Sequence, residues 1–223
     1  MAYQLSTVVA KVQRRIRDTG YSATEITDYI NDTQNEIFNE YKLPFMQAVQ
    51  TYTLTPNVSD ITNGAGLPTN YVQALDVTIT TANQERTIPF KDIREVDLLH
   101  PDPDDLTANP ASGASFWYFY ANTIRVYPAP KNADTLSVRY YKRPTTLAND
   151  ADVPSVPSEF EELLVVGAAY RVLQVKDNYD QAGVLQAKYD EILQKLVMKY
   201  NRPQVGTPTR MRMNRHAMGK TSY

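Results

Sequence analysis

Acidic side chains are the residues of this chain that could most readily do chemistry. One group lies in the sequence HPDPDD at residues 100–105, where Asp102, Asp104 and Asp105 could bind a divalent cation. Two prolines stiffen this stretch, and neither the glycine nor the glutamate of a calcium-binding loop follows at the required spacing. We therefore interpret it as a solvated surface loop.

A second acidic group consists of Glu159, Glu161 and Glu162, which follow two prolines at the start of a predicted helix. Two carboxylates held close together can act as general acid and general base. Acidic residues in a first helical turn, however, ordinarily stabilise the positive end of the helix dipole. Ser158 and Glu161 also have the spacing of a capping box. The structural interpretation is therefore favoured.

Other catalytic signatures are weak. The sequence NGAG at residues 63–66 resembles part of a phosphate-binding loop, but its lysine and threonine are missing and no helix is predicted to follow, so we expect a turn. The chain contains two histidines and no cysteine, which leaves no thiol nucleophile, cysteine zinc site, disulfide or serine–histidine–aspartate arrangement to argue. The sequence gives no positive sign of an enzyme, a cofactor or a metal site.

An aromatic run, FWYFY at residues 116–120, is the most distinctive apolar stretch. Exposed rings of this kind could stack on sugars or bases. The run alternates opposite a second strand-like segment at residues 124–127, which favours a place in a sheet core or an interface. The 16 tyrosines of the chain, against 6 phenylalanines, also suit interfaces, because tyrosine combines apolar area with a polar tip.

Charge is distributed unevenly along the chain. Residues 201–223, which we call the C-terminal arm, contain five basic residues and no acidic one, while the first 200 residues have a net charge of −7. Arginine and methionine alternate within the arm, and together they offer forked hydrogen bonds to carboxylates and adaptable apolar contacts. We predict a docking arm that contacts a partner or a neighbouring subunit; a solvated chain end and a DNA contact are the alternatives, and an acidic body would repel DNA. The predicted contact residues are Arg202, Arg210, Met211, Arg212, Met213 and Arg215.

Helical periodicity marks both ends of the chain. At the C-terminal end it predicts helices at residues 158–176 and 180–200, and at the N-terminal end a helix at residues 6–18 that stops at Gly20 and a helix from a Ser22 cap to about Pro44. Two helices cannot cover the apolar side chains that the C-terminal pair carries. We therefore expect the two pairs to form one antiparallel four-helix bundle.

The segment between the pairs changes to a period of two. Leu75, Val77 and Ile79 alternate with polar residues, residues 116–120 and 124–127 read as a hairpin, and residues 91–99 could form a short helix. The predicted fold class is α+β: a bundle from residues 1–44 and 150–200, an antiparallel β-sheet domain inserted at 45–149, and an extended C-terminal tail at 201–223. No apolar run approaches 18 residues, so no membrane span is predicted.

Residues at the junction between sheet and bundle carry a resemblance. The sequence YYKRP at residues 140–144, the prolines before the C-terminal helices, FEELL at residues 160–164 and GAAY at residues 167–170 are similar to the corresponding region of tailed-bacteriophage head-to-tail adaptors, also called connector or tail tubular protein A-like proteins. The order of helices, inserted sheet, helices and tail resembles that family along nearly the whole chain.

The resemblance implies a structural protein of the virion, made in the host cytoplasm and placed at the head–tail junction. It implies a homo-oligomeric ring of twelve copies under the portal protein, a tail nozzle or tail completion protein on the far side, and genomic DNA that passes through the lumen without sequence-specific binding. Two alternatives stay open on the residues alone. One is a non-catalytic, tail-associated module that recognises a glycan or peptide through its aromatic sheet, and the other is a hydrolase that uses Glu161 or Asp104.

Overall fold

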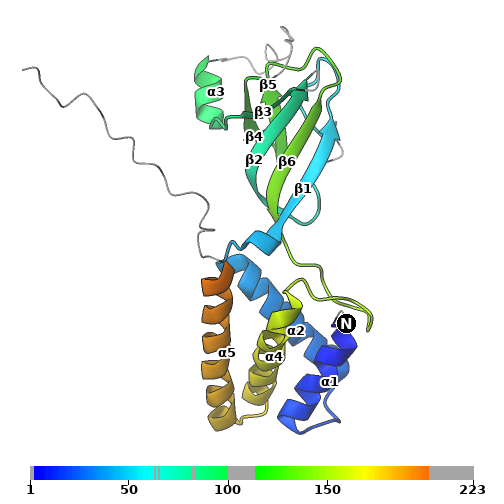
Figure 1. Cartoon of the computed structure of the whole chain (residues 1–223), viewed down its shortest axis with the longest axis vertical. Coiled ribbons are helices and arrows are strands. Elements are labelled where there is room, and N and C mark those ends of the chain that lie inside the picture. Colours follow the sequence, from blue (N-terminus) through cyan, green and yellow to red (C-terminus); the bar gives the residue numbers. More distant parts are fainter. Residues whose placement is uncertain (1–2, 63, 65, 82–83, 100–113, 201–223) are drawn as a thin grey trace, which may run out of the picture.

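The computed structural model describes residues 3–62, 64, 66–81, 84–99 and 114–200. A helical body occupies one end of the molecule and a β-rich body the other, joined at one corner (Figure 1). Within the described residues, no helix has both the length and the apolar character needed to cross a membrane. The α+β fold class and the pairing of the two chain ends are confirmed.

Four long helices form the helical body. They are α1 (Leu5–Ile16), α2 (Ala23–Glu40), α4 (Glu161–Val175) and α5 (Tyr179–Tyr200). Helix α4 lies at the centre and packs against each of the other three. Nine of its residues are buried, around most of its circumference: Leu163, Leu164, Val165, Val166, Gly167, Ala168, Ala169, Val172 and Leu173. A helix that is apolar all round needs partners on every side, which is why the two terminal pairs fold together.

A polar contact fixes α4 against α2. Arg171 of α4 donates from Nη1 to Thr33 Oγ1 at 2.6 Å and forms an ion pair with Glu36, both on α2. Gly167, one turn earlier on α4, faces Thr33 and Tyr189 of α5. The three helices therefore meet closely at Gly167.

Two predicted helix ends are wrong in detail. Helix α1 ends at Ile16, before the predicted last residue Asp18, because Arg17 itself adopts the left-handed conformation (φ 55°) and its N–H bonds the Arg14 carbonyl. The Ser158 capping box does not form, because Ser158–Phe160 make a turn of 3₁₀ helix and α4 begins only at Glu161. At α2, Ser22 does accept the predicted bond from Glu25 N, at 3.5 Å.

The β-rich body contains two sheets, where a single sheet was expected. The larger is antiparallel with strand order β1-β6-β2-β3, formed by β1 (Gln47–Thr53), β2 (Tyr71–Thr81), β3 (Gln84–Ile88) and β6 (Thr135–Lys142). The smaller is the predicted hairpin, β4 (Phe116–Tyr120) with β5 (Thr123–Tyr127). The short helix α3 (Ile93–Leu99) lies between β3 and β4, as predicted, and one isolated bridge, Phe90 to Trp117, links the hairpin to the end of β3. A second core fills the space between the two sheets.

A β-bulge places Leu75 on the opposite face of the sheet from the one that the sequence predicts. The register of β2 against β6 shifts between Ala74 and Asp76, so Leu75 is the extra residue. Val77 and Ile79 are fully buried, whereas Leu75 is 39% exposed. A bulge reverses the alternation of side chains on its N-terminal side, and the period-two pattern in the sequence does not reveal it.

The close approach at Gly167 generates a stability prediction. A Cβ at this position would lie 2.6 Å from Thr33 Cγ2 and 3.1 Å from the Tyr189 ring. We expect Gly167→Ala to lower the free energy of unfolding by about 1–3 kcal/mol, because overpacking outweighs the gain in helix propensity. Urea denaturation monitored by circular dichroism measures the change.

Gly183 in α5 is the matched control, because a Cβ there would meet nothing within 4 Å. Gly183→Ala is expected to raise stability by about 0.5–1 kcal/mol. Equal effects of the two substitutions would contradict the packing argument.

Candidate functional site

The three glutamates near the start of α4 form ion pairs with neighbouring helices. Glu161 accepts from Lys11 of α1 at 2.6 Å, and Glu162 accepts from Arg15 of α1 at 2.6 Å and from Lys188 of α5 at 2.7 Å. Glu159 pairs with Lys199 at the far end of α5. Each glutamate thus forms an ion pair that links α1 or α5 to the start of α4. These ion pairs support the structural interpretation of this group over an acid–base couple.

The pKa shifts follow from these contacts. Partial burial opposes ionisation of Glu162, but hydrogen bonds from Lys188 and Arg15 outweigh burial and lower its pKa. Hydrogen bonds from Lys199 and Tyr200 lower the pKa of Glu159, and the same contact with Glu159 raises the pKa of Tyr200 to about 12. A general acid at neutral pH needs a raised carboxylate pKa, and these two carboxylates shift the opposite way.

The HPDPDD stretch at residues 100–105, interpreted from its sequence as a solvated loop, lies outside the described residues. Within the described ranges, no three His, Asp or Glu side chains converge as a metal site. The NGAG segment also gives no phosphate cradle in its described part. Gly64 and Gly66 adopt φ values of 82° and 79°, the left-handed conformation that a turn requires, and Gly64 lies in the predicted turn.

The aromatic run divides into a buried part and an exposed part. Phe116, Trp117 and Tyr118 are buried, whereas Phe119 and Tyr120 are 38% and 48% exposed. The prediction of a core role is therefore right for the first three rings. Trp117 lies in the core between the sheets and is only 8% exposed, which disfavours a glycan platform centred on it.

A shallow aromatic groove of about 340 Å³ lies where the hairpin meets β2. Phe119 stacks on Tyr71 with ring centroids 6.4 Å apart, and Phe90 packs on Trp117 at 4.7 Å. Leu75, turned outward by the bulge, is also part of the lining. The sequence does not identify Phe90, because it is a single aromatic residue after Pro89 and belongs to no pattern. It does not identify the bulge either.

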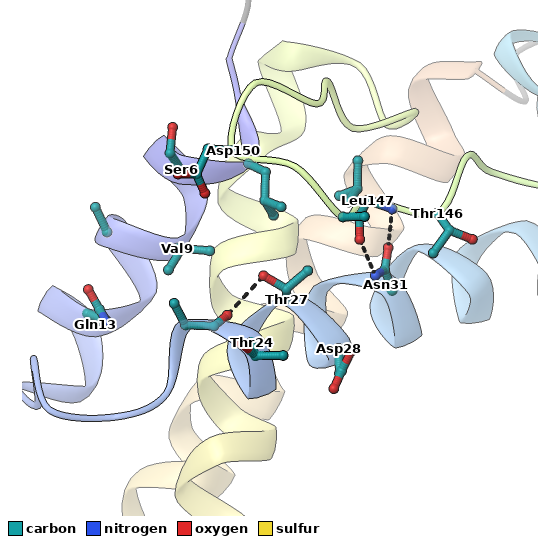
Figure 2. Close-up of a pocket in the computed structure, with 14 residues that line it drawn as sticks. Ser6, Val9, Gln13, Thr24, Thr27, Asp28, Asn31, Thr146, Leu147 and Asp150 are labelled. Carbon is teal, nitrogen blue, oxygen red and sulfur yellow. Dashed lines mark hydrogen bonds between the residues drawn. The ribbon is translucent and has the colours of Figure 1, made fainter.

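A second, more polar groove of about 550 Å³ lies between α1, α2 and the segment that leads back from the sheet. Figure 2 shows Ser6, Gln13, Thr24, Asp28 and Asp150 along its walls. One side is fixed by Asn31, whose side-chain amide donates to the Leu147 carbonyl at 3.0 Å and accepts from Leu147 N at 2.9 Å. These bonds tie the returning segment to α2.

The predicted arm contacts, Arg202, Arg210, Met211, Arg212, Met213 and Arg215, lie outside the described residues. The structure does place the point from which the arm departs. Tyr200, the last residue of α5, packs against Phe45 with ring centroids 5.1 Å apart and against Phe160 at 6.2 Å. The arm therefore begins at the corner where the bundle meets the sheet.

The described residues thus offer two surface grooves, and the three glutamates near the start of α4 are held in ion pairs between helices. Comparison with protein families matches residues 3–213 to the family described as SU10 adaptor protein. The chain belongs to this family of phage adaptor proteins. A comparison with curated proteins gives no match.

The Glu162 contacts generate a pH prediction. A folded-state pKa below the unfolded value of about 4.3 adds stability that is present above that value and is lost as the pH falls through the folded pKa. We expect Glu162→Gln to be less stable than the parent chain at about pH 7, with a difference that narrows as the pH falls below the unfolded value of about 4.3. Urea denaturation at each pH measures it.

Glu191→Gln is the control, because Glu191 pairs with Lys195 on the same helix and both side chains are 64% exposed. Exposed pairs contribute little, so its effect at neutral pH should be smaller. A difference for Glu162→Gln that persists unchanged at low pH would argue against the ionic origin.

Proposed function

We propose that this chain is the head-to-tail adaptor of a tailed-bacteriophage virion and acts without catalysis. In this proposal, copies of the chain form a ring of twelve under the portal protein, a tail nozzle or tail completion protein binds the far side, and genomic DNA passes through the lumen. The observation that carries the proposal is the family match over residues 3–213, which includes both bodies of the fold and continues past Tyr200 into the arm.

The charge of the body supports a role beside DNA without binding it. The first 200 residues have a net charge of −7. Asp28, Asp32, Glu36 and Glu40 follow one another at intervals of four along α2, and Asp28, Asp32 and Glu40 are exposed. Residues at this spacing share one face of a helix. An acidic face gives phosphates no counter-charge to displace, so DNA could slide along such a surface.

The arm supports a role in docking. Its five basic residues are opposite in charge to the body, and its methionines can adapt to an apolar surface. Arginine forms paired hydrogen bonds with carboxylates, which favours a protein partner with acidic and apolar side chains. We propose that the arm reaches the portal or a neighbouring subunit.

Reconstitution with the purified portal protein of the same phage tests the proposal. The full chain is expected to form a closed ring on the portal, visible in negative-stain class averages and countable by native mass spectrometry. A chain that ends at Tyr200 should lose portal binding or ring closure, because it lacks the arm but keeps every described helix and strand.

Charge and apolar contacts are separated by two variants. Arg210→Ala with Arg212→Ala removes two charges, and Met211→Ala with Met213→Ala removes two apolar side chains from the same stretch. Each is expected to weaken portal binding by at least about tenfold, which corresponds to about 1.4 kcal/mol. Lys220→Ala is the matched control. Unchanged binding by the chain that ends at Tyr200 would overturn the docking role of the arm, and failure of the full chain to bind portal would overturn the function.

A further inference from the structure

The two edge strands of the larger sheet, β1 and β3, differ in the residues that they contain. Among the described residues, β1 pairs only with β6, so the other side of β1 presents backbone N–H and C=O groups without strand partners. The seven residues of β1, QAVQTYT, contain no charge and no proline. Natural edge strands normally use charges or proline to block unwanted pairing, and β1 carries neither device.

The opposite edge has such protection. Strand β3 contains Glu85 and Arg86, and Pro89 follows its last residue. The Arg86 side chain donates to the Ala114 carbonyl, and the chain beyond β3 turns to bond the hairpin, where Trp117 N donates to the Pro89 carbonyl at 3.0 Å. The contrast within one sheet indicates that β1 is kept open for a strand.

The C-terminal arm starts near the first residue of β1. Tyr200 packs on Phe45, and Phe45 is two residues from Gln47, the first residue of β1. Seven strand residues extend about 23 Å. Residues 201–208 could span at most about 26–29 Å if fully extended. This length is sufficient for the residues that follow to reach β1.

The sequence of the arm has the pattern of an edge strand. In residues 209–213, TRMRM, Thr209, Met211 and Met213 alternate with Arg210 and Arg212, which is the period of a strand with one apolar and one charged face. Pro208 immediately before this stretch marks where pairing would begin. The sheet offers matching faces: Ala48 and Tyr52 of β1 pack on the apolar core, while Thr51 faces Ser137 on the polar side.

We propose that the free edge of β1 is a strand-binding surface and that its occupant in the unassembled subunit is residues 209–213 of the same chain, added as a fifth strand. The short tether favours the same chain over a second copy, because a linker that matches the span gives an effective concentration in the millimolar range. The inference concerns the isolated subunit, so it stands or fails independently of portal binding and ring formation.

Disulfide trapping tests the occupant, and the absence of native cysteine makes each trap specific. Val49→Cys places a thiol on β1 at a side chain that is 63% exposed. It is combined in turn with a cysteine at each position from Thr209 to Met213. Because disulfides need Cα atoms within about 7 Å, we expect oxidation within one chain at alternate arm positions only.

Arg86→Cys on β3, combined with the same arm positions, is the matched edge control and should trap none of them selectively. Equal trapping at both edges, or trapping without alternation, would overturn the proposal. A disulfide between two chains would overturn it too, because it would assign the edge of β1 to the arm of a second copy.

Hydrogen exchange of the isolated subunit gives an independent readout. Removal of residues 201–223 is expected to speed exchange of β1 amides by at least about tenfold, and so is Met211→Pro with Met213→Pro, because proline cannot donate to a sheet. Lys220→Pro is the control and should leave β1 protected. If β1 exchanges at the same rate in the full and truncated chains, the edge has no such occupant and the proposal is wrong.

Discussion

The structure depends on a helix that is buried around most of its circumference. Helix α4 carries Leu163–Ala169 without a polar interruption and is enclosed by α1, α2 and α5. No helix pair can enclose it alone, since α5 covers one side and the N-terminal pair the others. The β-rich body is inserted between the two helix pairs, and Leu43, Met46, Leu147 and Val156 beside it belong to the core of the bundle.

Polar contacts then set how the helices sit around α4. Arg171 connects α4 to Thr33 and Glu36 of α2, and the glutamates at the start of α4 reach lysine and arginine side chains of α1 and α5. Most of these pairs are partly exposed, so each contributes modestly. These pairs act mainly on geometry. Burial of apolar surface brings the helices together, and ion pairs at several positions along α4 favour one rotation of each helix about its axis.

The sequence predicts the helices and their partnership well, because their apolar side chains follow a period set by helix geometry. It also predicts the hairpin around Ala121–Thr123 and the burial of Trp117. It fails where a local backbone choice decides the outcome. Arg17 takes a left-handed conformation that glycine usually occupies, the bulge turns Leu75 outward, and the 3₁₀ turn at Ser158 delays the start of α4. The bulge lies in the pairing of β2 with β6, which are far apart in the sequence, so no local pattern encodes it.

The aromatic groove is another feature that the sequence pattern does not predict. Phe90 and Phe119 line the same groove because the fold brings their segments together, so their proximity follows from tertiary structure and not from sequence spacing. The division of the bundle between the two chain ends also has a consequence for synthesis. The N-terminal pair leaves the ribosome about 120 residues before α4 does, which at 5–20 residues per second amounts to roughly 6–24 s. During that interval Val8, Val12 and Ile30, which belong to the same core as α4 in the folded chain, have no α4 to cover them.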